Sequence, residues 1–276
     1  MKTICGLCPH RCALGPGQTG LCRARTNRDG TIVCSNYGRV TSLALDPVEK
    51  KPFRQFYPGS FILSVGSYGC NLRCPFCQNS EISMAGPQTE TVTLMPEELA
   101  AKAAELAKRP AGNLGAAFTY NEPLVGFEYV RDCAALLREA GLKTVLVTNG
   151  YVCGEPLRKL LPLVDAMNID LKGFTEEYYR WLGGDLETVK NSIALSAAQC
   201  HVEVTTLIVP GRNDAEADME AEAAWLATLS PEIPLHITRF FPRYRLQDVG
   251  PTPVETVFRL CGIARKHLHH VYAGNC

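Results

Sequence analysis

From Gly59 onward, the chain alternates short runs of β-branched and aliphatic residues with longer amphipathic stretches. The runs predict strands, and the stretches between them have the length and periodicity of helices. A regular alternation of the two predicts βα units that share one parallel sheet. The predicted strands cover residues 61–67, 115–119, 143–148, 166–171, 202–209, 235–240 and, with a weaker pattern, 270–273. The predicted helices cover residues 96–108, 124–140, 155–161, 186–199, 215–229 and 253–267.

Six or seven such units are too few to close an eight-stranded barrel. We therefore expect an α/β fold in which residues 59–276 form an open, partial parallel barrel of the (β/α)6 type. The carboxyl ends of its strands would lie at one end, where active sites of such barrels are found. Residues 1–58 are rich in Cys and Gly and predict a small, metal-binding appendage with a hairpin around residues 36–38.

The charge balance and the hydropathy of the chain argue against two classes of partner, nucleic acids and membranes. The 28 Lys and Arg residues balance 28 Asp and Glu residues, so the chain has no net positive field for a nucleic-acid backbone. No apolar run approaches the length of about 18 residues that a membrane span needs, and the first residues lack a targeting pattern. We expect a cytoplasmic protein that binds neither nucleic acid nor membrane.

Eight of the 13 cysteines fall in two groups, at positions 5, 8, 12, 22 and 34 and at positions 70, 74 and 77. Clustered cysteines in a reducing compartment indicate metal ligation. A disulfide scaffold is the alternative, but such scaffolds suit secreted chains of fewer than about 100 residues.

The second group forms a CxxxCxxC loop, directly after the first predicted barrel strand. Three thiolates on one irregular turn can hold three corners of a 4Fe-4S cluster and leave the fourth iron open. Zinc is the alternative, but a structural zinc site would need a fourth protein ligand from elsewhere. The position at the catalytic end of the barrel favours a cluster on Cys70, Cys74 and Cys77.

Four closely spaced cysteines of the first group, at positions 5, 8, 12 and 22, would form a closed ligand set that leaves no open position on a metal. Zinc and a second iron–sulfur cluster both accept four cysteines, and the spacing does not separate them. Such a site is structural, or at most an electron relay. Cys34 could replace one member, and His10 is a weaker substitute. The predicted ligands are Cys5, Cys8, Cys12 and Cys22.

Seven sequence motifs are spread over most of the chain. They are CGLCPHRC at residues 5–12, DPVEKKP at 46–52, FYPG at 56–59, the cysteine loop at 70–79, FTYNEP at 118–123, NIDLKG at 168–173 and IVPG at 208–211. The cysteine loop resembles that of the radical S-adenosylmethionine (SAM) superfamily, in its pyruvate formate-lyase-activating-enzyme-like branch. The combination of motifs looks like the radical SAM component of the AmmeMemoRadiSam system.

The resemblance implies a 4Fe-4S enzyme that cleaves SAM reductively and abstracts hydrogen from a substrate with the 5′-deoxyadenosyl radical. It implies a low-potential electron donor such as flavodoxin or ferredoxin. Two substrate classes fit: a small molecule handled together with Memo-like and AMMECR-like proteins, or a glycyl radical enzyme activated by this protein. A non-enzymatic electron-transfer or metal-binding module is the alternative from another class.

The resemblance also implies a SAM pocket built from successive strand ends. Its members would contact the amino group (Asn121, Glu122), the carboxylate and ribose (Thr148, Asn149, Asp170, Lys172), the adenine (Phe76, Pro210, Gly211) and the region of the radical (His236). Several of them have a plainer reading: a helix cap for Glu122, an internal ion pair for Asp170 and Lys172, a turn at Pro210, and core packing for Phe76 and His236.

Cys276 would follow the last strand, where its thiol could meet the radical, or it is simply a free terminal cysteine. Arginines 239, 243 and 245 lie near the same end and could bind a substrate anion, although solvated loop residues are the plainer reading. Histidines 267, 269 and 270 have no spacing that indicates a metal site.

Overall fold

A computed structural model describes residues 2–276 and contains one large sheet of eight strands. The strand order is β14-β13-β12-β11-β10-β9-β7-β6. All neighbouring pairs from β7 to β14 are parallel, so their carboxyl ends lie at the same end of the sheet. The strands are β6 (Ser42–Pro47), β7 (Phe61–Gly66), β9 (Gly115–Phe118), β10 (Lys143–Thr148), β11 (Ala166–Asp170), β12 (His201–Ile208), β13 (Leu235–Arg239) and β14 (Val271–Gly274).

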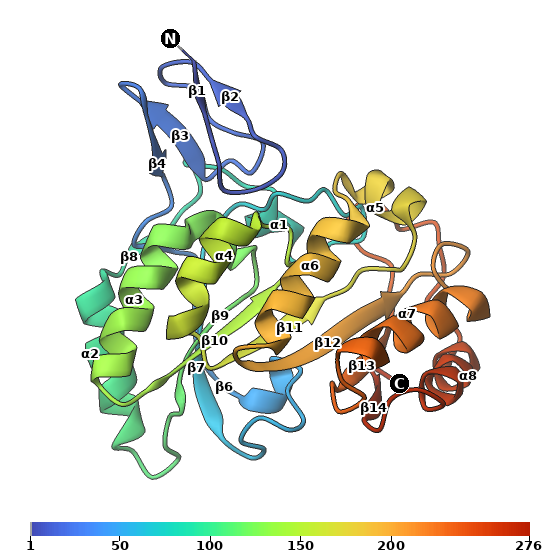
Figure 1. The fold of residues 1–276 in the computed structure, drawn as a ribbon. Coiled ribbons are helices and arrows are strands. Elements are labelled where there is room, and N and C mark those ends of the chain that lie inside the picture. The colour runs from blue at the N-terminus through green and yellow to red at the C-terminus, as the bar shows by residue number, and fades with distance from the viewer. Residues whose placement is uncertain (1) are drawn as a thin grey trace.

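Within residues 2–276, no ladder joins β14 to β6, so the barrel is open as expected. All seven predicted strands form, and no bound differs from the prediction by more than one residue. The main helices lie along the outer face of the curved sheet (Figure 1). They are α2 (Pro96–Ala107), α3 (Phe127–Glu139), α4 (Gly154–Leu160), α6 (Leu186–Ala197), α7 (Glu216–Leu229) and α8 (Val254–Ala264).

Several short elements complete the barrel domain. The predicted helix at 124–140 is divided, because Pro123 begins a 3-10 turn before α3. The remaining helices are α1 (Ser80–Ser83), α5 (Glu176–Leu182) and the 3-10 turns η1 (Val48–Lys50), η2 (Pro123–Gly126) and η3 (Leu161–Leu163). No helix in residues 2–276 is long and apolar enough to cross a membrane.

Strand β6 is a feature that the sequence did not predict. It pairs antiparallel with β7 over six residues, from Ser42 opposite Gly66 to Pro47 opposite Phe61. The large sheet therefore begins before residue 59, where the sequence placed the start of the barrel. We place the division between the two parts near Thr41.

The segment after β6 fills the inside of the open barrel. Phe53 is fully buried and packs with Val48, Phe56 and residues from the inner face of the strands. Glu203 on β12 accepts hydrogen bonds from the backbone amides of Arg54 (2.9 Å) and Gln55 (2.8 Å). The barrel thus has its own small core at this position, separate from the large one between sheet and helices.

The amino-terminal residues, from the start of the described chain to the division near Thr41, form a small lobe at one end of the barrel, which we call the knob (Figure 1). It contains two antiparallel pairs, β1 (Thr3–Ile4) with β2 (Ala13–Leu14), and β3 (Arg25–Arg28) with β4 (Thr31–Cys34). The expected hairpin around residues 36–38 is wrong. The turn lies at Asp29 and Gly30, which both have positive φ, whereas β5 (Arg39–Val40) pairs with β8 (Val92–Thr93).

Candidate functional site

The three-cysteine loop leaves the carboxyl end of β7, as the sequence predicted. Gly69 has a φ of +92°, so it bends the chain just before Cys70 in a conformation that favours glycine. The Cys77 amide donates to the Cys74 carbonyl at 3.2 Å, which makes a tight turn between these two ligands. Cys74 is buried, and Cys70 and Cys77 are half-buried. The loop therefore presents all three thiols from one short segment.

Burial and nearby charged groups both act on these thiols. Burial, and after it the charge of Glu122, raises the pKa of Cys70 well above its usual range. Burial raises the pKa of Cys74 to about 11, against the attraction of the Lys172 ammonium. Buried thiolates need compensating positive charge, which a bound metal centre provides. The donor set therefore fits a three-thiolate cluster.

Asn121 holds the cysteine loop in place. Its Oδ1 accepts from the Ser67 amide at 2.9 Å, and its Nδ2 donates to the Gly69 carbonyl at 3.0 Å. Both ends of the amide are thus engaged with the loop, so in this structure Asn121 positions the backbone that precedes Cys70.

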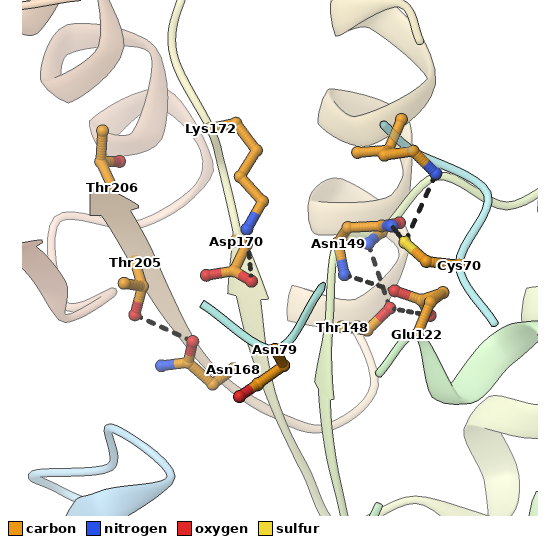
Figure 2. Close-up of polar contacts among 12 residues, drawn as sticks. Cys70, Asn79, Glu122, Thr148, Asn149, Asn168, Asp170, Lys172, Thr205 and Thr206 are labelled. Carbon is orange, nitrogen blue, oxygen red and sulfur yellow. Dashed lines mark hydrogen bonds and ion pairs between the residues drawn. The ribbon is translucent and has the colours of Figure 1, made fainter. Parts of the chain in front are cut away.

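Glu122 lies at the centre of a buried network (Figure 2). Its carboxylate accepts from the Thr148 hydroxyl at 2.6 Å and from the Asn149 amide at 2.8 Å. It also caps the following turn by accepting from the Leu124 amide. Burial raises the pKa of Glu122 to about 7, although these three donors oppose the shift. The capping role expected as a plainer alternative is therefore present, together with cross-strand contacts.

Asn149 connects this network to the cluster loop. Its Nδ2 points at Cys70 Sγ at 3.6 Å and donates to Asn71 Oδ1 at 3.0 Å. Figure 2 shows Glu122, Thr148, Asn149 and Cys70 side by side. The structure thus brings together residues from three strand ends that the sequence assigned to one pocket.

Asp170 and Lys172 point the same way at the end of β11, as expected for residues two apart on a strand (Figure 2). Lys172 Nζ lies 2.8 Å from Asp170 Oδ2. Burial opposes the charged ammonium, but Asp170 and Cys74 outweigh it and raise the pKa of Lys172. The ion pair that the sequence offered as an alternative forms, and it lies near the cluster ligands.

Phe76 is buried against α5, a helix that the sequence did not predict. Its ring centroid lies 5.8 Å from that of Trp181 and 6.4 Å from that of Tyr178. Pro210 and Gly211 form a turn directly after β12, where Gly211 has a φ of +69°. Phe76 therefore lies in the loop after β7, and the Pro210–Gly211 turn lies after β12, as the sequence predicted.

His236 lies inside the barrel and is 4% exposed. Its Nε2 lies 2.6 Å from Glu203 Oε2, and its ring stacks on Tyr272 at 5.3 Å. Burial alone would raise the pKa of Glu203, but hydrogen bonds from His201, His236 and two backbone amides lower it to about 2. The histidine thus has the satisfied surroundings of a core residue, and Glu203 is a buried anion that the sequence analysis missed.

The sequence analysis named the DPVEKKP motif at residues 46–52 but did not predict the buried polar cluster that this motif forms. Lys51 is 4% exposed and lies 3.0 Å from Asp46 Oδ2, which also accepts from the Tyr120 hydroxyl at 2.9 Å. Tyr120 has a φ of +72°, and its carbonyl accepts from Asn79 Nδ2 at 2.8 Å. This cluster connects β6, the barrel-filling segment and the last residue of the cysteine loop.

The four amino-terminal cysteines lie around one cavity of about 10 Å³ in the knob. Burial, and then the neighbouring Cys22 and Cys5, raise the pKa of Cys8 to about 11. His10 also lines the cavity, whereas Cys34 does not and donates to Asn36 Oδ1 instead. In residues 2–276, no three Cys, His, Asp or Glu side chains are gathered closely enough to hold one metal ion between them.

The remaining residues singled out in the sequence have other partners. Cys276 is exposed, and its thiol donates to the Gly274 carbonyl at 3.6 Å. Arg239 donates to the Thr252 carbonyl, and the Arg245 amide donates to the carbonyl of Pro75 in the cysteine loop. The three histidines pair with glutamates: His267 with Glu220, and His269 and His270 with Glu232.

Comparison with known families matches residues 64–224, more than half of the chain, to the radical SAM superfamily. The chain is 41% identical to an uncharacterized protein of Methanocaldococcus jannaschii, over 99% of this chain and 81% of that protein. It is 23% identical to the pyruvate formate-lyase 1-activating enzyme of Escherichia coli K12, over 74% of this chain and 88% of that enzyme.

A solved structure shares the fold. The radical SAM methyltransferase from Sphaerobacter thermophilus superposes with a TM-score of 0.58 at 18% identity, over 79% of this chain and 67% of that chain. The expected open barrel and the expected resemblance to activating enzymes are both confirmed.

Proposed function

The chain belongs to the radical SAM superfamily, and we propose that Cys70, Cys74 and Cys77 hold its 4Fe-4S cluster and that SAM binds beside them. Membership of the superfamily makes the protein an enzyme and implies both cofactors. The observation that carries the residue assignment is the single loop of three thiols at the carboxyl end of β7, with Asp170, Lys172 and the Glu122 network around it.

When bound, the cluster supplies the electron that cleaves the sulfonium of SAM to methionine and a 5′-deoxyadenosyl radical. The chain's own residues would position the cysteine loop and keep water away from the reacting groups. Asn121 fixes the backbone before Cys70, Asn149 donates to its sulfur, and Lys172 balances negative charge at Cys74. Burial of the loop against the sheet excludes water, which protects a reactive intermediate.

For SAM itself, we propose the pocket that the strand ends form. Asp170, Lys172, Thr148 and Asn149 take the carboxylate and ribose, and Glu122 and Asn121 take the amino group. Glu122 and Asn121 already have partners in the chain, so SAM would compete with these or be held through them. Phe76, Pro210 and Gly211 would contact the adenine, and His236 would contact SAM near the site of the radical.

The substrate we propose is a small organic molecule, from which the radical abstracts hydrogen in a system like AmmeMemoRadiSam, with Memo-like and AMMECR-like partners. The motif set at residues 46–52, 118–123 and 208–211 supports this proposal. A second candidate is activation of a glycyl radical enzyme, which the similarity to the E. coli activating enzyme favours. In either case the reductant is a low-potential donor such as flavodoxin or ferredoxin, and the four knob cysteines hold zinc or a second cluster.

The direct test is anaerobic formation of 5′-deoxyadenosine. Protein reconstituted with iron and sulfide is reduced with dithionite and mixed with SAM. We expect product from the wild type, none above background from Cys74→Ala, and wild-type yield from Cys200→Ala, a half-buried cysteine outside both groups. A fully loaded and reduced wild type that makes no 5′-deoxyadenosine would favour the electron-transfer module instead.

A further inference from the structure

Glu203 is a buried carboxylate on the inner face of β12, and four hydrogen-bonding groups surround it. Its side chain has no exposed surface. Oε1 accepts from the Gln55 amide at 2.8 Å and lies 3.0 Å from His201 Nε2. Oε2 accepts from the Arg54 amide at 2.9 Å and lies 2.6 Å from His236 Nε2. Burial raises the pKa of Glu203, but these hydrogen bonds outweigh burial and lower the pKa to about 2, so the group is an anion near neutral pH.

The charge of Glu203 determines where the proton of His236 lies. An ionised carboxylate has no proton to donate, so the ring nitrogen that faces it must carry one. Nε2 of His236 is therefore the protonated nitrogen, and in a neutral ring Nδ1 is then an acceptor. Within residues 2–276, Nδ1 makes no hydrogen bond of its own. Because the ring also stacks on Tyr272, with the two planes 29° apart, both its orientation and its proton are fixed.

His236 lies at the level of the proposed SAM pocket. In the parallel ladders Asp170 is opposite Thr205, and Thr205 is opposite His236. Residues paired in this way point to the same face of a sheet, so the three side chains form one row across β11, β12 and β13. Figure 2 shows Asp170 and Thr205 in this row. Neighbouring strands are about 4.8 Å apart, so a ligand that contacts Asp170 needs to extend only about 10 Å to reach His236.

The barrel-filling segment between β6 and β7 fixes the carboxylate from the other side. The two amides that bond to Glu203 belong to consecutive residues of this segment. The segment is itself anchored, because Phe53 is fully buried and the Pro52 carbonyl accepts from Asn168 Nδ2 at 2.8 Å. Glu203 cannot turn away without leaving both amides unpaired. The segment thus directs Oε2 of Glu203 toward His236.

We infer that Glu203 is a positioning residue for His236. Its carboxylate keeps the proton of the ring on Nε2, so that Nδ1 is left to accept a hydrogen bond from a donor group of bound SAM, such as a ribose hydroxyl. Glu203 acts through His236 and does not itself contact SAM. The contact with SAM rests on the proposed function, whereas the position of the proton does not.

Glu203→Gln separates this role from simple support of the barrel-filling segment. Gln has nearly the same shape as Glu, but one of its two polar atoms is an NH2 group that can only donate. Its oxygen should stay at the position of Oε1, where it can still accept from the Arg54 and Gln55 amides. The NH2 group then faces His236, so Nε2 must become the acceptor and the ring proton must move to Nδ1. The segment keeps its support, but the tautomer reverses.

The first test locates this proton by nuclear magnetic resonance of the whole chain with 15N-labelled histidine, at pH 8 and without SAM. Long-range proton–nitrogen spectra distinguish the two neutral tautomers and the doubly protonated ring, and His236→Asn identifies the signals by their loss. We expect Nε2–H in wild type and Nδ1–H in Glu203→Gln. Glu232→Gln is the matched control and should keep the wild-type pattern, because that carboxylate pairs with His269 and His270 instead.

Two results of this test would overturn the inference. One is Nδ1–H or a doubly protonated ring in wild type, which decides the question even if Glu203→Gln does not fold. The other is an unchanged tautomer in Glu203→Gln, because the proton would then be held by something other than the carboxylate.

The second test measures the Kd of SAM by equilibrium dialysis with reconstituted, oxidised protein, where no reductant is present and SAM is not consumed. The loss of one hydrogen bond corresponds to a change of about five- to tenfold in Kd. We expect this weakening in Glu203→Gln, in His236→Asn and, to the same extent, in the double variant, since both changes remove one contact. Additive losses, or wild-type affinity in Glu203→Gln, would overturn the positioning role. If wild type with a loaded cluster binds no SAM while the tautomer reverses as expected, the proposed function fails and the assignment of the proton stands.

Discussion

Glu222 is a carboxyl group buried on α7, outside the candidate site. It is 2% exposed, and the Thr206 hydroxyl of β12 donates to it. Burial raises the pKa of Glu222 to about 8, although this hydrogen bond opposes the shift, and the nearby charge of Asp218 adds to it. The side chain is therefore largely protonated in the folded protein near neutral pH, whereas it is ionised in the unfolded chain.

Because the pKa of Glu222 differs between the folded and the unfolded protein, the free energy of unfolding depends on pH and falls as the pH rises. The folded pKa lies above the unfolded value, so the contribution of Glu222 is fully present below about pH 4.5 and is lost as the pH rises toward 8. Between pH 6 and pH 8.5, wild type should lose on the order of 2 kcal/mol more stability than Glu222→Gln. Urea unfolding at both pH values measures this difference.

The matched control for this prediction is Glu216→Gln on the same helix, where the carboxylate is exposed and paired with Arg259. That variant should follow the wild-type pH dependence. An equal pH dependence in wild type and Glu222→Gln would show that the carboxyl is ionised in the fold.

At this scale, the sequence revealed the ligands better than their surroundings. The spacing of Cys70, Cys74 and Cys77 within one loop is a local pattern, so it is visible in the sequence. The partners of Glu122 lie on the next strand, and those of Glu203 come from a segment about 150 residues earlier in the chain. Contacts of this kind depend on the tertiary fold, and no local spacing encodes them.

Among the elements, the barrel-filling segment between β6 and β7 has a role that the open shape of the sheet requires. An open parallel barrel exposes the inner faces of its strands unless something covers them. Phe53, Phe56 and Val48 cover part of that face, and Glu203 satisfies the backbone amides that enter with them. The segment thus replaces packing that a closed barrel would obtain from opposite strands.

Phe53→Ala tests this role. The side chain is fully buried, so its removal should lower the free energy of unfolding by about 3 to 5 kcal/mol. Because Phe53 lies away from the cysteine loop, the iron content after reconstitution should remain that of wild type. Denaturant unfolding and iron analysis measure the two quantities. The same substitution at Phe258, which is 52% exposed on α8, should change stability by less than about 0.5 kcal/mol.

The elements also show which secondary structure can be predicted from the periodicity of apolar residues and which cannot. The parallel strands were found because buried runs such as β10 (Lys143–Thr148) stand between clear helices. Strand β6 was missed because it is bounded by a proline and carries Asp46 and partly exposed residues on both faces. Helix α5 has only seven residues, so its helical period is weak; α4 is equally short but was predicted, because it lies between two clear strands.

For the whole molecule, the boundary between knob and barrel is the feature on which both cysteine groups depend. At Gly69 the two parts approach each other closely. Gly69 has a φ of +92°, and an added Cβ would collide with the Cys22 carbonyl and approach Ala24. The cysteine loop and the knob are therefore fitted to each other through a position that has no room for a side chain.

Gly69→Ala should consequently separate the two parts, and Gly17→Ala is its matched control. Both glycines have positive φ, so both variants carry a similar backbone cost of about 1 kcal/mol, but nothing lies within 4 Å of a Cβ at Gly17. Only Gly69→Ala should increase amide hydrogen exchange in residues 22–25 and 67–71, by at least tenfold, as measured by mass spectrometry. Equal exchange in the two variants would show that the protein accommodates the added methyl group without separating the two parts, and the close fit at Gly69 would then not be what holds them together.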